Sequence, residues 1–327
     1  MGVSDPLEPK PGDTIPSGDS IADGRFKTLK LLRAAGAQPL RSLADATAIH
    51  NNPAVVAAVA GKTHQGRVRT ENQDHFLVAS LERSLLVEDS SLPAEAGTRL
   101  TDTPQGRLFI VADGIGGHGG GEIASAVAVD AMAHYAFETM PWVLRREDCS
   151  IDELGEGLRE AMQKAQARIR RVARRKNLNP DLGTTLTMGY VAWPELFLVH
   201  VGDSRGYLYR DGALHRLTRD HTLAQQLVDG NAMSEEEAKT SRLAHVLVNA
   251  MGGHSDDLDV ELHRMELELE DQLLFCSDGL YDMVGDDEIA KHLGLTDRPV
   301  AEIVDRLVDA ANAAGGRDNV TVVLARF

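Results

Sequence analysis

Short apolar segments that follow one another with few helices between them constrain the fold of this chain most. From residue 55 onward, nine runs are apolar or alternate between apolar and polar residues, which is typical of β-strands: 55–60, 76–79, 108–112, 185–192, 196–201, 206–209, 258–265, 272–276 and 320–325. Longer runs predict helices at 121–139, 151–176, 222–228, 286–292 and 300–314. Strands mostly follow strands, and the two longest helices come together in the middle. This order favours antiparallel sheets with helices outside over an alternating parallel α/β fold.

One glycine-rich segment suggests a different fold. Residues 109–125, FIVADGIGGHGGGEIAS, contain G-x-G-x-x-G between a strand-like and a helix-like run, as a dinucleotide-binding turn does. Asp113 directly before the first glycine would repel the pyrophosphate of such a ligand. Asp130 has roughly the spacing of a ribose-binding acid, but it falls inside a predicted helix. The strand order and the charge therefore both disfavour a dinucleotide site.

Aspartates stand at the edges of five predicted strands. Asp113, Asp203 and Asp278 end the runs FIVAD, LVHVGD and LLFCSD, whereas Asp74 and Asp318 come just before strands. One such residue is explained by hydrogen bonds to nearby backbone amides. If the strands are neighbours, however, five carboxylates converge, and their mutual repulsion requires a compensating charge. Hard divalent cations, which prefer oxygen ligands, supply it, and glycines beside three of the aspartates let backbone approach an ion closely.

The charge of the chain limits its partners. With 34 basic and 50 acidic residues the formal net charge is −16, so nucleic acid and anionic membrane surfaces are not expected as main partners. An acidic protein that acts on phosphate needs added cations. We find no apolar run of about 18 residues and no signal-peptide pattern, so we expect a cytoplasmic location.

Neither cysteine suggests chemistry. Cys149 and Cys276 are too far apart in sequence to form a zinc site by themselves, and neither is followed by an arginine six residues on, as in a cysteine-nucleophile phosphatase loop. Cys276 is expected to be a small buried residue.

Six segments in order carry a family resemblance. The sequence resembles the bacterial branch of the metal-dependent protein serine/threonine phosphatases of type 2C over about residues 55–327, in RTENQD (69–74), VADGIGGHGGGEIAS (111–125), GTTLT (183–187), VGDSRGYLYRDGALHRLTRDHT (201–222), LLFCSDGLYDMV (273–284) and GRDNVTVVL (316–324). The resemblance implies an α+β fold, a four-layer α-β-β-α sandwich with two central antiparallel β-sheets. It also implies a dinuclear Mn²⁺ or Mg²⁺ site at one edge.

The same resemblance implies a ligand for each metal position. Asp113 would bridge both metals, and Gly114 would bind through its backbone carbonyl. Asp278 and Asp318 would hold the first metal, and Asp74 would serve the second, directly or through water. A metal-bridging hydroxide would then attack phosphorus in line, so that no protein nucleophile is required.

Three further positions complete the implied site. Asp203 matches a residue that, in bacterial relatives, helps to hold a weaker third metal together with Asp278. Arg69 matches the arginine that clamps the substrate phosphate, although Arg67 lies nearby and a surface role remains an alternative. Animal members carry a catalytic histidine where this chain has Ile115. His118 is therefore a candidate proton donor or a packing residue, and metal-bound water is an equally good acid.

Two segments have less certain roles. Residues 1–54 form an N-terminal extension, rich in Pro, Gly, Asp and Ser up to about residue 24, which we expect to be partly disordered or to dock onto a partner. Residues 218–254 fall where bacterial relatives carry a mobile flap. Within that segment, Ser234 is expected to cap a helix that begins at residues 235–237, EEE. A role of this acidic turn in substrate selection is the weaker alternative.

The main hypothesis is a monomeric, cytoplasmic phosphatase that removes phosphate from serine and threonine in proteins and opposes a bacterial protein kinase. Its partners would be the phosphorylated protein substrate and the cognate kinase. A non-catalytic binding module of the same fold and a small-metabolite phosphatase are the alternatives.

Overall fold

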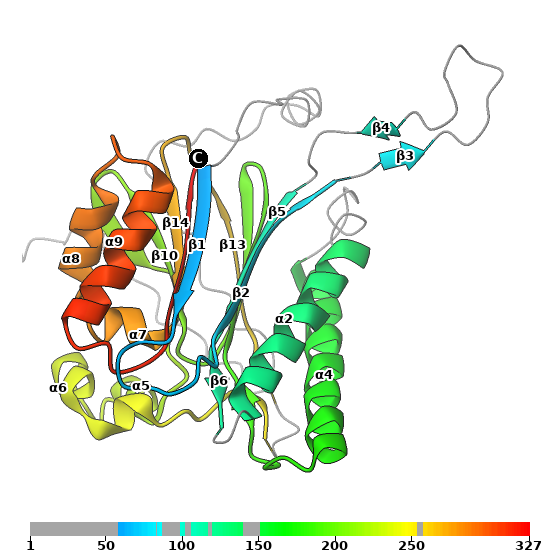
Figure 1. Cartoon of the computed structure of the whole chain (residues 1–327), viewed down its shortest axis with the longest axis vertical. Coiled ribbons are helices and arrows are strands. Elements are labelled where there is room, and N and C mark those ends of the chain that lie inside the picture. Colours follow the sequence, from blue (N-terminus) through cyan, green and yellow to red (C-terminus); the bar gives the residue numbers. More distant parts are fainter. Residues whose placement is uncertain are drawn as a thin grey trace, which may run out of the picture.

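The computed structural model describes residues 58–82, 84–86, 99–101, 106–116, 120–139, 151–253 and 258–327. The N-terminal extension 1–54 lies outside these residues, as does His118. The described residues form two five-stranded sheets, two smaller sheets and helices on both outer sides (Figure 1).

The first five-stranded sheet is antiparallel throughout and has the order β1-β15-β14-β10-β11. Its strands are β1 (Ala58–His64), β15 (Val320–Arg326), β14 (Gln272–Cys276), β10 (Arg205–Arg210) and β11 (Ala213–Arg216).

The second five-stranded sheet, with the order β13-β9-β8-β5-β2, is also antiparallel. It consists of β13 (Glu261–Glu266), β9 (Glu195–Val201), β8 (Leu186–Ala192), β5 (Gly106–Ala112) and β2 (His75–Leu81). The smaller sheets are β12-β7-β6 (Met251–Gly252, Gly183–Thr184, Gly114–Ile115) and β3-β4 (Ser84–Leu86, Arg99–Thr101).

Helices cover the outer face of each large sheet. α2 (Gly120–Glu138) and α4 (Ile151–Lys176) pack together beside the second sheet, and α8 (Asp286–Leu293) and α9 (Val300–Ala313) lie beside the first (Figure 1). Between β10 and β14 the chain forms α5 (Leu223–Asp229), α6 (Glu235–Thr240) and η1 (Arg242–His245), and α7 (Asp278–Tyr281) follows β14.

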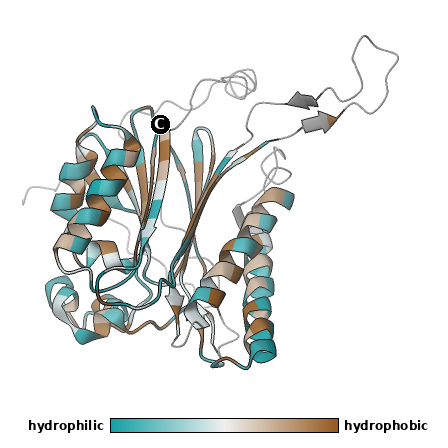
Figure 2. Cartoon of the chain, in the orientation of Figure 1, coloured by the Kyte–Doolittle hydropathy of each residue, from teal (hydrophilic) through white to brown (hydrophobic). Residues whose placement is uncertain are grey.

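Within the described residues, three apolar cores hold the four layers together. Met132 of α2 and Met188 of β8 belong to the core between the helices and the second sheet. Phe109 and Phe275 stack between the two sheets, with ring centroids 5.9 Å apart. Leu307 of α9 belongs to the core on the other side of the first sheet. Figure 2 shows hydrophobic residues along the central strands. On α8 and α9 it shows both hydrophobic and hydrophilic residues, as expected for helices with one buried face. The predicted α-β-β-α sandwich is confirmed.

The predicted elements agree closely with the observed ones. The helix over 151–176 and the strand over 272–276 have the predicted limits, and most other boundaries differ by one or two residues. The first strand is an exception, since it runs from Ala58 to His64 instead of 55–60. The two-residue strands β6, β7 and β12 were not predicted, because a pairing this short leaves no periodic pattern.

The strand registers bring one end of every central strand to the same edge of the sandwich. His75 at the start of β2 pairs with Ala112 at the end of β5, and Cys276 at the end of β14 pairs with Val322 near the start of β15. Because neighbouring strands are antiparallel, the residue that follows one strand lies beside the residue that precedes the next strand in the sheet. This edge carries the predicted aspartates.

Candidate metal centre

Asp74 lies where the two large sheets meet. Its carboxylate Oδ2 accepts hydrogen bonds of 2.7 Å from Ser277 Oγ and of 2.7 Å from Thr321 Oγ1, both from the first sheet. Only 3% of Asp74 is exposed. Its other oxygen, Oδ1, is buried and has no hydrogen-bond partner among the described residues. A buried carboxylate oxygen without a partner is costly, so this atom is a candidate ligand.

Backbone contacts fix the position of Asp113, which follows β5. Its N–H donates to Thr185 Oγ1 (2.9 Å), and its carbonyl accepts from Thr185 N (2.9 Å) and Thr184 Oγ1 (2.8 Å). The next residue, Gly114, must be glycine, since a Cβ there would lie 2.3 Å from the backbone of Gly121. The glycines therefore allow the start of α2 to pack directly on the turn that carries Asp113.

Asp278 and Asp318 come from the first sheet. Asp278 begins α7 directly after β14, and its Oδ1 is a second buried carboxylate oxygen without a partner in the described part of the chain. Asp318 precedes β15, and its Oδ1 accepts a hydrogen bond of 2.8 Å from Asn319 N. Its Oδ2 contacts Arg69 Nη2 at 2.5 Å.

The carboxylates lie close enough to repel one another. Burial, followed by the charges of Asp74 and Asp278, raises the pKa of Asp113 well above its ordinary value. Burial and then the charges of Asp203 and Asp282 do the same to the pKa of Asp278. Burial also raises the pKa of Asp74 to about 6. These buried carboxylates repel one another, and two of their oxygens, Asp74 Oδ1 and Asp278 Oδ1, have no hydrogen-bond partner among the described residues. Such a group of oxygens is suited to bind hard divalent cations.

Asp203 approaches the same site from the turn between β9 and β10. It is 5% exposed, and burial together with the charges of Asp220 and Asp282 raises its pKa to about 7. Tyr281 donates a 3.0 Å hydrogen bond from its hydroxyl to the Asp203 carbonyl. All five predicted aspartates are thus brought together by the fold.

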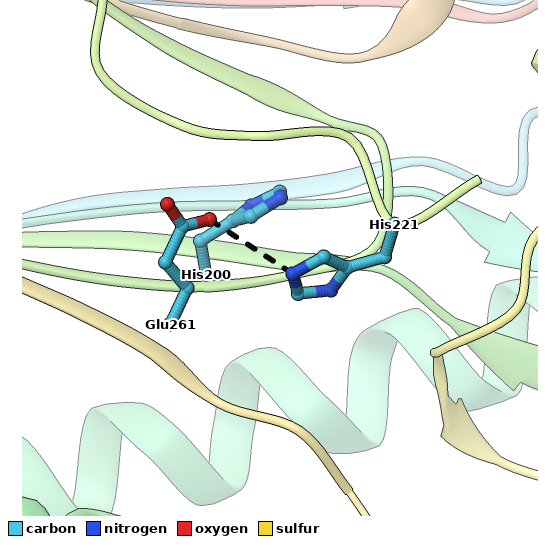
Figure 3. Close-up of side chains that lie close together, drawn as sticks. All are labelled: His200, His221 and Glu261. Carbon is cyan, nitrogen blue, oxygen red and sulfur yellow. Dashed lines mark ion pairs between the residues drawn. The ribbon is translucent and has the colours of Figure 1, made fainter. Parts of the chain in front are cut away.

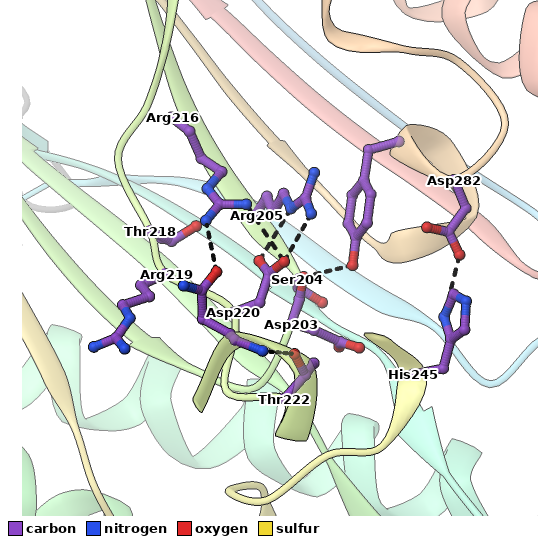
Figure 4. Close-up of polar contacts among 12 residues, drawn as sticks. Asp203, Ser204, Arg205, Arg216, Thr218, Arg219, Asp220, Thr222, His245 and Asp282 are labelled. Carbon is purple, nitrogen blue, oxygen red and sulfur yellow. Dashed lines mark hydrogen bonds and ion pairs between the residues drawn. The ribbon is translucent and has the colours of Figure 1, made fainter. Parts of the chain in front are cut away.

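A buried ion pair supports the Asp203 turn. Arg205 donates to both carboxylate oxygens of Asp220, at 3.0 and 2.7 Å (Figure 4). Its guanidinium also stacks 3.5 Å above the centroid of the Tyr281 ring. The edge of the guanidinium binds the Asp220 carboxylate and its face contacts the Tyr281 ring. These two contacts together hold Arg205, and with it the Asp203 turn, in place.

Two neighbouring histidines, His200 and His221 (Figure 3), hold Gly202, the residue before Asp203. His200 Nε2 lies 2.9 Å from the Gly202 carbonyl, and His221 Nδ1 accepts a 3.1 Å hydrogen bond from Gly202 N. Burial lowers the pKa of His200 to about 4, so its ring is neutral at pH 7. The cluster of His200, His221 and Glu261 has the ligand types of a metal site. However, Thr187 Oγ1 lies 2.9 Å from the other ring nitrogen of His200, so both nitrogens have partners and the cluster supports the loop.

Asn319 places Arg69 beside the carboxylates. Its side-chain amide donates to the carbonyls of Gln65 (2.9 Å) and Glu71 (2.8 Å), and its Oδ1 accepts from Gln73 N (2.8 Å). These three bonds fix both ends of the segment that carries Arg69. The Arg69 side chain is 57% exposed and can reach a ligand from outside.

Several supporting residues were not singled out from the sequence. Thr185, Ser277, Asn319 and Thr321 stand inside the motifs GTTLT, LLFCSDGLYDMV and GRDNVTVVL, but nothing in the pattern distinguishes their roles. Their hydrogen bonds connect residues far apart in sequence. A hydroxyl or amide close to a candidate metal ligand in the same motif was the only available signal.

The described part of the flap segment, residues 218–253, contains α5, α6 and η1. Ser234 caps α6 in a capping box, in which Ser234 Oγ accepts from Glu237 N and the Glu237 carboxylate accepts from Ser234 N (2.9 Å). The predicted cap is confirmed. The acidic residues of the first turn are exposed, and the capping geometry alone accounts for Glu237.

Comparisons with known proteins agree with this geometry. Residues 88–325 match the family model for protein phosphatase 2C. The chain belongs to the protein phosphatase 2C family. A serine/threonine protein phosphatase of Mycobacterium tuberculosis, PstP, is 40% identical over 226 residues, which cover 67% of this chain and 40% of that protein. This chain therefore spans well under half the length of that protein phosphatase 2C relative.

Other relatives match over nearly their whole length. The serine/threonine phosphatase stp of Listeria monocytogenes is 30% identical over 263 residues, which cover 80% of this chain and 93% of that protein. The crystal structure of the M. tuberculosis phosphatase superposes with a TM-score of 0.65 at 33% identity and covers 84% of this chain and 99% of that one. A PstP catalytic domain solved with two manganese ions gives a TM-score of 0.62 at 34% identity, covering 83% of this chain and 98% of that one.

The described helices of this protein phosphatase 2C member include none that is both long enough and apolar enough to span a membrane.

Proposed function

We propose that residues 55–327 form a metal-dependent phosphatase domain that hydrolyses phosphoserine and phosphothreonine in proteins. The observation that carries the proposal is the convergence of Asp74, Asp113 and Asp278, whose buried oxygens lack protein partners or repel one another. The family match and the relatives named as serine/threonine phosphatases support the same reading.

Two Mn²⁺ or Mg²⁺ ions are the proposed cofactors. Asp74, Asp113, Asp278, Asp318 and the Gly114 carbonyl would hold these ions. Bound there, the ions supply charge neutralisation and an activated water for attack on phosphorus. The solved relative with two manganese ions supports this composition.

The protein itself binds and orients the substrate. Arg69 lies beside Asp318 at the exposed rim, and its planar guanidinium can donate two hydrogen bonds to the oxygens of a phosphate monoester. The bound phosphate would replace Asp318 as the main partner of Arg69. The hydrogen bonds from Ser277 and Thr321 keep Asp74 Oδ2 in place, which leaves Oδ1 directed to the ligand.

The proton donor for the leaving alkoxide is not assigned to a side chain. Ile115 cannot donate a proton, and His118 lies outside the described residues. We keep His118 and a water molecule as the two alternatives for this step.

The biological setting is part of the proposal. We propose a cytoplasmic signalling role in which the enzyme acts as a monomer, on phosphorylated proteins, against a cognate serine/threonine kinase. The acidic composition supports the need for cations and counts against nucleic acid as a partner.

Hydrolysis of a phosphothreonine peptide by chelator-stripped protein tests the function. Activity should return with Mn²⁺ or Mg²⁺, and Asp113→Asn and Asp278→Asn should lower kcat by at least about 10²-fold, the range seen when a transition-state charge contact is lost. Asp309→Asn, an exposed change of the same kind on α9, is the matched control. A folded protein without activity under any metal would favour the non-catalytic module.

A further inference from the structure

We propose that the basic end of α4, which consists of Arg171, Arg174, Arg175 and Lys176, binds an acidic segment of the phosphorylated protein substrate. The inference rests on the proposed function and names a substrate class for it, namely phosphoproteins that carry Asp or Glu residues near the phosphorylated side chain. This surface lies outside the metal centre. It would therefore act on the binding of the substrate and leave the chemical step to the metal centre.

The sequence of α4 places basic residues along one exposed face of the helix. Lys164, Arg168, Arg171 and Arg175 follow one another at intervals of three or four residues, and all of them are exposed. Residues at these intervals lie on the same side of a helix. Ile169, in contrast, is buried in the core that α4 shares with α2.

Only the first part of this face has acidic partners. Lys164 pairs with Glu160 at 2.8 Å, and Arg168 pairs with Asp130 of α2 at 2.5 Å. At the basic end of α4, no described residue forms an ion pair with any of the four side chains. Positive charge is thus concentrated at one place on a chain whose formal net charge is −16. Such a local positive field attracts anionic groups whatever the charge of the whole protein.

The helix dipole explains only part of this cluster. Cations in the last turn stabilise a helix by interacting with its C-terminal carbonyls, which accounts for Arg174, Arg175 and Lys176. The effect decreases within that turn and does not explain Arg171. Moreover, Arg171 and Arg175 are four residues apart, and like charges at this spacing destabilise a helix. An anionic partner bound between them would remove the repulsion.

The end of α4 lies beside the turn that carries the metal ligands. The segment after the helix packs on the glycine-rich loop, since a Cβ on Gly120 would lie 3.3 Å from Leu182 Cβ. Gly183 then pairs with Ile115, the residue after Gly114. Figure 1 shows the end of α4 at the same edge of the sandwich as β6. A polypeptide whose phosphate occupies the metal centre can therefore extend along this edge to the basic end of α4.

The flap side of the same edge has the opposite charge. Glu235, Glu236 and Glu237 are exposed in the first turn of α6. Figure 1 shows α6 and the end of α4 on opposite sides of β6. An acidic segment is repelled from the flap side and attracted to α4, so the two surfaces together favour one direction of the bound polypeptide.

Hydrolysis of two phosphothreonine peptides tests the inference. The peptides differ only in four flanking residues, which are Glu in one and Gln in the other. At low ionic strength, we expect wild-type kcat/KM to be about fivefold higher for the Glu peptide, mainly through KM, as two exposed ion pairs allow. Arg171→Gln combined with Arg175→Gln should remove this preference. Arg298→Gln combined with Arg306→Gln removes the same charge near α9 and is the matched control.

The hydrolysis of a small aryl phosphate, which cannot reach α4, measures the metal centre separately. A wild type that hydrolyses it but shows no preference for the Glu peptide would overturn the inference and leave the proposed function intact. Equal losses of preference in both double variants would also overturn it, because they would indicate general attraction. A wild type without activity on any of the three substrates would overturn both proposals.

Two other occupants of the surface give different results. If it binds an anionic membrane, cosedimentation with vesicles that contain phosphatidylglycerol should be lost only in the α4 double variant, and the peptides should show no preference. If it binds the chain's own N-terminal segment, the α4 double variant should show faster tryptic cleavage within residues 1–54 and unchanged peptide kinetics. Either result would replace the substrate as the partner.

Discussion

Ser277 Oγ donates a 2.7 Å hydrogen bond to Asp74 Oδ2, which joins the end of β14 in one sheet to the start of β2 in the other. Ser277 Oγ also accepts from Thr321 N at 2.9 Å. The hydroxyl has no role in the proposed chemistry. It orients a carboxylate, so that the other oxygen of Asp74 remains available to a cation.

Ser277→Ala should therefore weaken metal binding more than catalysis. Losing a supporting hydrogen bond to a metal ligand typically costs about 10- to 100-fold in metal affinity. We expect the Mn²⁺ concentration for half-maximal activity to rise by about tenfold or more, with most of kcat recovered at saturating Mn²⁺. Ser80→Ala, an exposed serine on β2, should change neither quantity.

Arg69→Ala should lower kcat/KM for a phosphopeptide by about 10²-fold, because a bidentate contact to the phosphate oxygens is lost. Arg69→Lys should recover only part of the loss, since an ammonium group cannot reproduce the planar fork. The neighbouring exposed Arg67 provides the control, and Arg67→Ala should retain nearly wild-type kinetics. Equal losses at both positions would point to general electrostatic attraction instead of a specific clamp.

The aspartate cluster should make the metal-free protein more stable as the pH is lowered from 8 to about 5, and this gain should exceed the opposing contribution of buried His200, whose pKa is lowered to about 4. The pKa of Asp74 is raised to about 6 and those of Asp113 and Asp278 are raised well above their ordinary values, so the folded state binds protons to these groups more tightly than the unfolded state does. This stabilisation is complete below the ordinary pKa of Asp and is lost as the pH rises through the raised values.

Thermal unfolding in a chelator at pH 5.5, 7 and 8 checks this direction. We expect Tm to be higher at the lowest pH by at least about 3 °C, which corresponds to ~1 kcal/mol for a domain of this size. Saturating Mn²⁺ should raise Tm most at pH 8, where the carboxylates are charged. A Tm that falls steadily with decreasing pH in the chelator would contradict the repulsion between the aspartates.

Asp220→Asn should strongly destabilise the fold, because it leaves the Arg205 guanidinium buried without its charge partner. The two side chains are 16% and 13% exposed. Removing one member of a buried pair costs about 3–5 kcal/mol. Glu302→Gln, which breaks exposed pairs with Arg298 and Arg306 on the outer helix, should cost less than ~1 kcal/mol. Urea denaturation of both variants measures the difference.

The acidic turn of α6 offers a test of substrate selection. Glu235→Gln together with Glu236→Gln removes charge and leaves the Glu237 capping box in place. If the turn selects substrates, the ranking of phosphopeptides with basic and acidic flanks should change, while a small aryl phosphate is hydrolysed as before. Equal changes for peptides and aryl phosphate would reject the selection role and leave only the cap.

Periodicity in the sequence determined the layers of this protein. The alternation and apolar runs around β5, β9 and β14 are sufficient to predict buried strands, and the long amphipathic run of α4 is sufficient to predict a helix with its observed limits. The aspartates at the strand ends were equally visible, since a strand end next to a glycine can be recognised locally.

Only the tertiary structure decided how these residues act together. The partnership of Ser277 with Asp74 spans 203 positions, and the proximity of His245 to Asp282 depends on where the flap returns to the core. Local sequence patterns indicate whether a segment is buried, but they do not indicate which strands lie beside it in the sheet. Pairing, unused carboxylate oxygens and mutual repulsion arise from distances in space, which the packing of the two sheets sets.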